Sequence, residues 1–200
     1  FMKYMADHGI ACVANDHRGH GASVHSHEDL GYMYKGGGMA LVGDMVQLTL
    51  WIYESFPDTS VYLLGHSMGS MAARVYAQKH DDLISGLILC GSPSWNPLAT
   101  FGYVLTGAMS MLGGGRLRPA FISDLVSGMY NRRFASEGPQ AWICSDPSVR
   151  LEYAGNPLCN YVFTVNGMHN LMGLMIIAYR DDGWDMHNPE MPVFFISGDD

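Results

Sequence analysis

The run Gly65–Gly69 (Gly-His-Ser-Met-Gly) has the Gly-x-Ser-x-Gly pattern and stands between two segments that should fold regularly. The apolar run Val61–Leu64 precedes it, and an alanine-rich stretch over residues 72–77 follows it. In this strand–turn–helix order the pattern forms a sharp turn that exposes a nucleophilic serine. A glycine-containing turn with an incidental serine is the alternative, and the flanking segments argue against it. We predict that Ser67 is the nucleophile of a serine hydrolase.

The residues around Ser67 suit such a turn. Gly65 and Gly69 flank it where the chain closes tightly and the serine backbone is strained, so that side chains would be excluded. His66 and Met68 are its direct neighbours in this elbow. The N–H of Met68, at the start of the following helix, should point to where an oxyanion develops. Met68 is therefore the predicted donor of half an oxyanion hole.

The composition describes a folded domain with a large apolar core. The chain has 200 residues, 48% hydrophobic and 15% charged, and a net charge of −8. This charge argues against nucleic acid or an anionic membrane as the main partner. No uncharged stretch reaches the roughly 20 apolar residues of a membrane span. The cysteines at 12, 90, 144 and 159 show neither close pairing nor zinc spacing, which favours a reduced, cytoplasmic protein.

Apolar runs and helical spacings alternate through the first ninety residues. Strands are expected over 10–14, 61–64 and 83–90, and helices over 39–55 and 68–80, with a stop at Phe56-Pro57-Asp58. These connection lengths require parallel crossovers, and the continuous apolar strands imply that helices cover both faces of the sheet. The predicted fold class is α/β, with a mostly parallel open sheet.

The alternation then stops for about a hundred residues. Helices are expected over 98–112, 122–130 and 171–179, and a strand returns over 192–196. An insertion at the sheet edge that carries the elbow is typical of a cap over an active site. We therefore divide the chain into a core (1–96), a helical cap with its return helix (97–190) and a final core strand (191–200).

The polar loop 15–23 admits a structural and a metal-binding interpretation. Asp16 should accept local backbone N–H groups, and Arg18 should pair with a nearby acid. The alternative is a metal site, whose candidate ligands are His17, His20, His25, His27 and Glu28. Their spacing matches no familiar zinc pattern, so we predict no metal.

Five arginines make the first part of the cap locally positive. Positions 116, 118, 132, 133 and 150 are arginine, against acids at 124, 137 and 146. A solvated face is the simpler interpretation, and a site for an anionic headgroup is the alternative.

Two motifs resemble a known group of hydrolases. The loop Asn15–Ser23 (Asn-Asp-His-Arg-Gly-His-Gly-Ala-Ser) resembles the Asp-x-Arg-Gly-x-Gly-x-Ser loop of monoacylglycerol lipase and lysophospholipase-type α/β-hydrolases, and Gly65–Gly69 is similar to their elbow. The cap segments 141–146, 156–159 and 163–164 resemble bacterial members, which are often labelled lysophospholipase or serine aminopeptidase-like. The resemblance implies an α/β-hydrolase fold and no cofactor.

The same resemblance places the rest of the catalytic machinery at or beyond the ends of this chain. The last strand and its turn at Gly198 look like those that bear the family's acid, which leaves Asp200 as the acid in this chain, one residue short of the usual position. The family histidine follows the acid, so His169 and His187, which precede it, are poor candidates for the base. An earlier loop supplies the second oxyanion donor. We expect a fragment that is nearly inactive alone.

The predicted activity is hydrolysis of carboxylic esters, of the monoacylglycerol or lysophospholipid type, through an acyl-enzyme on Ser67. The expected partner is a small-molecule or lipid ester, with transient lipid contact by the cap. A peptidase or thioesterase with the same triad and a non-catalytic protein that binds an apolar ligand are the alternatives. A third is that this fragment has no function of its own.

Overall fold

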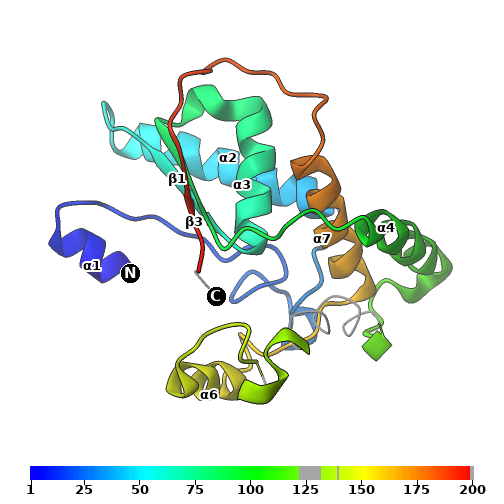
Figure 1. Ribbon diagram of the computed structural model, residues 1–200. Coiled ribbons are helices and arrows are strands. Elements are labelled where there is room, and N and C mark those ends of the chain that lie inside the picture. Colours follow the sequence, from blue (N-terminus) through cyan, green and yellow to red (C-terminus); the bar gives the residue numbers. More distant parts are fainter. Residues whose placement is uncertain (122–131, 139, 199–200) are drawn as a thin grey trace.

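The computed structural model describes residues 1–121, 132–138 and 140–198 (Figure 1). The main elements are α1 (Met2–Asp7), α2 (Gly37–Ser55), β1 (Tyr62–His66), α3 (Met68–His80), β2 (Gly86–Cys90), α4 (Leu98–Met109), α6 (Pro147–Gly155), α7 (Val165–Ala178) and β3 (Val193–Ile196). Short 3-10 turns lie at His27–Asp29, Asp81–Leu83 and Ala135–Glu137, and a π-helical turn over Ser110–Gly114 extends α4.

The three strands form one parallel sheet in the order β1-β2-β3, as predicted (Figure 1). Leu64 pairs with Ile88, and Ile88 pairs with Phe194, so these side chains share one face. Parallel strands bring their carboxyl ends to the same edge. The turn after β1, which contains Ser67, and the loop after β2 therefore meet at that edge.

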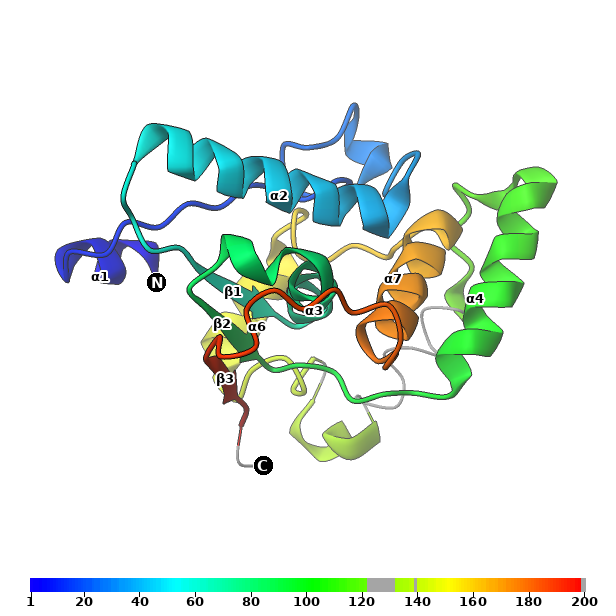
Figure 2. The ribbon, with the colours of Figure 1, turned by 90° about the horizontal axis from the view of Figure 1, so that it is seen from above.

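The core lies between one face of the sheet and three helices. α3 packs directly on β1 and β2, and α2 and α7 pack against α3 (Figure 2). Ala72 and Ala73 of α3 have no exposed surface, so the helix approaches the strands closely. Tyr76 is also fully buried, and its hydroxyl donates to Thr49 of α2. Small and apolar side chains on α3 thus fix the helix that begins at the elbow.

The opposite face of the sheet is exposed in the part of the chain that the structure describes. Leu64 is 43% exposed and Phe194 63% exposed, and both lie on this face. The prediction that helices cover both faces is therefore wrong for the described residues. The apolar residues of these strands indicate that both faces can be buried, but they do not show which element covers each face.

Several predicted boundaries change. Residues 10–14 form no strand, and Ile10 and Val13 are exposed, because this segment has no paired neighbour. α7 begins at Val165 and not near 171, since Thr164 caps it by accepting the Gly167 N–H at 3.1 Å. The helix expected over 122–130 lies outside the described residues.

Two arginines fasten the cap to the core. Arg118 donates to the carbonyls of Glu28 and Leu30 in the core and, through Nε, to that of Val162 where the chain leaves the cap. Arg116 pairs with the carboxylate of Asp29, and this hydrogen bond lowers the pKa of Asp29. Both arginines are exposed, as a solvated face predicts, but each is also bound to the core, so neither is a free cation.

The buried carboxylate of Asp81 ties the chain that leads to β3 onto the end of α3. It accepts the backbone N–H groups of His187 at 3.1 Å and Asn188 at 2.9 Å. Burial alone would raise the pKa of Asp81, but these hydrogen bonds outweigh it and the net pKa is below its ordinary value of 3.8. The ionised form is therefore the stabilising one.

We expect Asp81→Asn to lower the free energy of unfolding at pH 7 by about 1–3 kcal/mol, because a neutral amide is a weaker acceptor for these N–H groups. A folded-state pKa that is depressed contributes stability above the unfolded pKa and loses it as pH falls through the folded value. Urea unfolding between pH 7 and pH 3 measures both effects. The variant should lose less stability below pH 4 than the parent, and equal acid sensitivity would contradict the assignment.

Candidate active site

Ser67 has the strained backbone that the elbow pattern predicts. Its φ is 52° and its ψ is −118°, a conformation that non-glycine residues rarely adopt. Its N–H donates to the carbonyl of Cys90 at 3.0 Å, which joins the turn after β1 to the end of β2. The register of the two strands therefore sets where the turn begins.

Within the described residues, a close contact explains why glycine is needed at only one of the two motif positions. A Cβ on Gly65 would lie 2.4 Å from the carbonyl oxygen of Gly69 and 2.8 Å from Cα of Ser70. A Cβ on Gly69 would meet no described atom within 4 Å, and the φ of Gly69 is not in the left-handed region. Close approach thus requires glycine at Gly65, and the expected requirement at Gly69 is not found here.

The hydroxyl of Ser67 is left free for chemistry. Ser67 occupies the N-cap position of α3, where a serine side chain ordinarily accepts a backbone N–H of the first turn. Here it makes no capping bond, because the left-handed backbone turns the side chain away from the helix. Met68 is the first residue of α3, so its N–H lies at the positive end of the helix dipole. This arrangement suits nucleophilic attack next to an oxyanion donor; the roles of both residues stay predictions.

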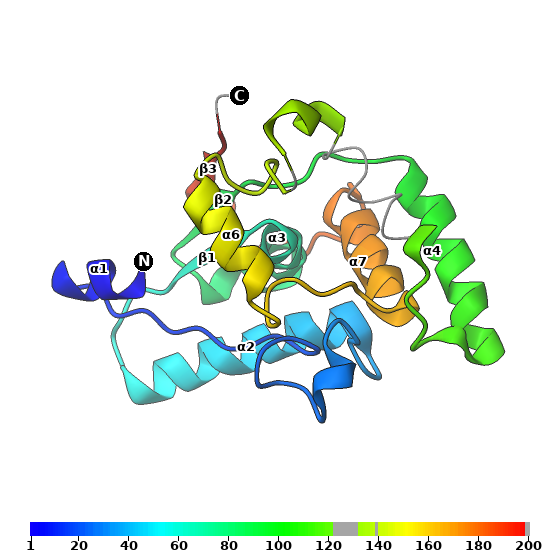
Figure 3. The same ribbon diagram turned by 90° about the horizontal axis from the view of Figure 1, so that it is seen from below.

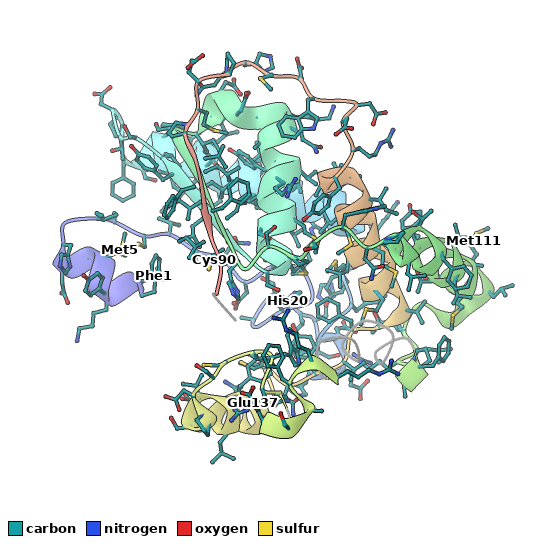
Figure 4. The ribbon with its side chains drawn as sticks, in the orientation of Figure 1. Phe1, Met5, His20, Cys90, Met111 and Glu137 are labelled. Carbon is teal, nitrogen blue, oxygen red and sulfur yellow. The ribbon has the colours of Figure 1, made fainter. Side chains whose placement is uncertain are left out.

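Part of the region predicted as a cap lies over the edge of the sheet that carries the elbow. In Figure 1, α6 lies beyond the carboxyl ends of the strands, and in Figure 3, seen from below, α6 overlies the strands and α3. His20 lies between the end of β2, marked by Cys90, and the cap segment that contains Glu137 (Figure 4). The His20 ring meets the rings of Tyr161 and Phe163 edge-on, at 5.9 and 5.5 Å between centroids.

These aromatic contacts are largely removed from water. Burial lowers the pKa of His20 and of its neighbour His17, which favours the neutral rings. Burial also raises the pKa of Tyr161 to about 12. Loop 15–23 and residues 161–163 thus meet through neutral aromatic groups.

The remainder of loop 15–23 is held by the polar contacts predicted for it. Asp16 accepts the N–H of Ala22 at 2.8 Å, and Arg18 makes a two-pronged pair with Asp44 of α2 at 2.6 and 2.7 Å. A cavity of about 640 Å³ opens beside this pair, lined by residues such as Asp16, Arg18 and Lys35, and Ser67 does not line it.

The alternative metal site is not formed. In the described part of the chain, the potential ligand atoms that converge belong to Asp81, Asp82 and His187, and none comes from the histidines of loop 15–27. His17 and His20 face each other as rings 6.3 Å apart, and His25 packs edge-on against Tyr34. These histidines make structural contacts.

Neither later histidine approaches Ser67 as a base. His187 contacts Asp81, just beyond the far end of α3, and the thirteen residues of that helix span about 20 Å. The Nδ1 atom of His169 contacts the carbonyl of Tyr103 at 3.0 Å, and the two rings are stacked. Asp200, the acid expected from the sequence, lies outside the described residues.

Comparisons with known proteins identify the fold. The profile of the hydrolase family described as serine aminopeptidase, S33, matches residues 1–200. A thermostable carboxyl esterase from Bacillus coagulans, solved with glycerol, is 28% identical over 88% of this chain with a TM-score of 0.80. An open-form lipase (19% identity, 97% of this chain, TM-score 0.66) and a soluble variant of monoglyceride lipase from Saccharomyces cerevisiae with a substrate analogue (15%, 98%, 0.66) share the fold.

The chain spans 58% of the length of the esterase, 58% of the lipase and 71% of the monoglyceride lipase. Among curated proteins, no match to this chain was found. No helix in the described residues is long and apolar enough to cross a bilayer.

We expect Gly65→Ala to destabilise the fold by about 1–3 kcal/mol, because the new methyl group must displace the backbone of α3 at Gly69. Gly43→Ala is the matched control. Gly43 lies in α2 where an added Cβ meets nothing within 4 Å, so the same change should stabilise by about 0.5–1 kcal/mol through helix propensity. Chemical denaturation measures both, and equal effects would refute the close approach.

Proposed function

Because this chain belongs to the serine aminopeptidase S33 family of hydrolases, we propose that its protein hydrolyses carboxylic esters through an acyl-enzyme on Ser67. The observation that carries the proposal is the backbone of Ser67: strained, placed between β1 and α3, and with its hydroxyl free of the helix it caps. A strained backbone persists only where the surrounding structure enforces it, and such positions cluster at functional sites.

We assign the first half of the reaction, formation of the acyl-enzyme, to Ser67 and Met68. Ser67 Oγ attacks the acyl carbonyl while a histidine accepts its proton, and the oxygen of that carbonyl becomes an oxyanion. The N–H of Met68, at the start of α3, donates to this oxyanion. As the tetrahedral intermediate collapses, the histidine gives that proton to the leaving oxygen, so the alcohol departs and an acyl ester remains on Ser67. Water then hydrolyses this ester. Since His169 and His187 are engaged elsewhere, we propose that the histidine and the second oxyanion donor come from parts of the fold outside this span.

The apolar character of the cap supports a lipid-like ester. α4 and the turn after it expose large apolar side chains: Phe101 (64%), Val104 (65%), Met111 (90%) and Leu112 (90%). Methionine adapts to varied apolar shapes, which suits acyl chains of different length. We therefore propose monoacylglycerol- or lysophospholipid-type substrates, and transient contact between this surface and lipid. The carboxyl esterase, at 28% identity, is the similar protein that supports ester chemistry most directly.

The family description favours one second candidate, an aminopeptidase with the same nucleophile. Such an enzyme needs an anionic group near Ser67 to bind the substrate's free amino terminus. The carboxylates described in and beside loop 15–23 are already engaged, Asp16 by the Ala22 N–H and Asp44 by Arg18, so we prefer the esterase.

We expect a fluorophosphonate probe to label the full-length protein at Ser67, because the probe forms a stable tetrahedral phosphonate on an activated serine. Ser67→Ala should abolish labelling and lower ester hydrolysis by at least about 10³-fold. Ser60→Ala, at an exposed serine before β1, is the control and should label like the parent. A folded full-length protein that is not labelled would overturn the proposal.

A substrate panel separates the two candidates. We expect p-nitrophenyl esters of medium and long acyl chains, monoacylglycerols and lysophospholipids to be cleaved far faster than aminoacyl p-nitroanilides, because the cap offers apolar surface. Initial rates at matched concentration measure this. Faster cleavage of the anilides would assign the peptidase.

A further inference from the structure

The carbonyl group of Ser67 is bound twice by one residue. It accepts the backbone N–H of Ser70 at 3.0 Å and the hydroxyl of Ser70 at 2.6 Å. Ser70 lies in the first turn of α3 and has no exposed surface. The carbonyl is thus held by a short, buried hydrogen bond in addition to the helical one.

Holding this carbonyl also orients the N–H of Met68. The two groups belong to the same peptide unit, which is planar and trans, so the C=O and N–H point in opposite directions. When the C=O of Ser67 points into the helix, the N–H of Met68 must point away from it, out of the N-terminal end of α3. Rotation of this peptide would remove the acceptor of a fully buried hydroxyl, which is unfavourable.

A second hydroxyl supports the first. Ser92 Oγ lies 2.9 Å from Ser70 Oγ, and Ser92 follows β2 in the loop at the same edge of the sheet. A serine hydroxyl has one proton to donate and can also accept. Because the Ser67 carbonyl can only accept, Ser70 donates its single proton there, and the 2.9 Å contact between the two hydroxyls then requires that Ser92 donate to Ser70. The order of donation is therefore Ser92 to Ser70 to Ser67 C=O, and such chains strengthen each bond.

We propose that Ser70 and Ser92 are positioning residues for the oxyanion donor: they hold the Ser67–Met68 peptide in the orientation that presents the Met68 N–H. The inference rests on the proposed function. The N–H of Ser67 belongs to the preceding peptide, between His66 and Ser67, and its bond to the Cys90 carbonyl holds that side of the turn. The competing interpretation is an ordinary serine that satisfies a nearby helical carbonyl, with no effect beyond stability.

Ser70→Ala in the full-length protein tests the proposal. Complete loss of an oxyanion donor costs about 10²–10³-fold in kcat. A donor that is present but less well oriented should cost less, about 10-fold. We expect kcat for a p-nitrophenyl ester to fall by this factor with KM little changed. The affinity for a boronic acid, which forms a tetrahedral anion on the serine, should fall by a similar factor, because both depend on the oxyanion.

Two further variants test the chain of donation. Ser92→Ala should reduce kcat less than Ser70→Ala does, and the double variant should equal Ser70→Ala alone, because Ser92 acts only through Ser70. Ser70→Cys, with its weaker S–H donor, should fall between the parent and Ser70→Ala. Additive losses in the double variant would overturn the order of donation.

Thr49→Val is the matched stability control. Thr49 is also buried, donates to a helical carbonyl at 3.0 Å and contacts a second hydroxyl, that of Tyr76, but it lies on α2 away from the elbow. Thr49→Val should lower Tm as Ser70→Ala does, while kcat and the affinity for the boronic acid stay unchanged. If Ser70→Ala lowers Tm alone, the role is structural and the proposal is wrong.

The remaining outcomes are also decisive. If Ser70→Ala does not fold, Ser92→Ala, in a loop with a partly exposed side chain, decides: unchanged boronic acid affinity overturns the proposal. A parent protein that fluorophosphonate does not label overturns the proposed function and this inference together. A labelled parent whose Ser70→Ala variant is labelled equally fast overturns this inference only.

Discussion

The left-handed backbone at Ser67 is the constraint on which the arrangement of this molecule depends. Such a conformation costs on the order of 1–3 kcal/mol and must be enforced by its surroundings. The N–H of Ser67 is fixed by Cys90 and the carbonyl by Ser70, so the turn is held at both ends. The first contact needs the parallel pairing of β1 with β2, and the second needs α3 seated on the sheet. Buried alanines on α3 permit that seat.

Arginines and main-chain carbonyls link the cap region to the core, in addition to the packing of α7 on α2 and α3. Arg118 binds the carbonyls of Glu28, Leu30 and Val162, and Arg116 stacks over Tyr32 while it pairs with Asp29. The planar guanidinium offers several donors in fixed directions, so a single side chain can link segments that are distant in sequence. The positive charge of these two arginines is therefore engaged by the core, although the side chain of Arg116 is 61% exposed.

Local patterns predicted the elements near the elbow well. The reasons for Gly65, for the apolar run of β1 and for the alanines of α3 are all local. Asp16 and Arg18 were likewise expected to find polar partners, because their side chains are charged. The pattern over residues 10–14 failed because an apolar run specifies a strand only when a partner strand is beside it. The partners of the cap arginines could not be predicted, because the acid that binds Arg116 is 87 residues away.

The site itself was only partly accessible to sequence reasoning. Ser67 and Met68 follow from a motif with a known geometry, whereas Ser70 and Ser92 are common residues in no recognisable pattern. Only the fold shows that their hydroxyls lie 2.9 Å apart. The convergence of loop 15–23 with Tyr161 and Phe163 is of the same kind, since it arises from the path of the cap.

The single side chain of Arg118 holds two points of the cap region, its own position and that of Val162, at one place on the core. The connection between these two points is therefore closed at its ends, and the entropy of closing a flexible loop rises by only about 0.6 kcal/mol for each doubling of its length. An insertion attached in this way can lengthen, shorten or be replaced during evolution with little disturbance to the sheet or the elbow. Proteins built on this core can thus diversify what they recognise while their chemistry stays the same.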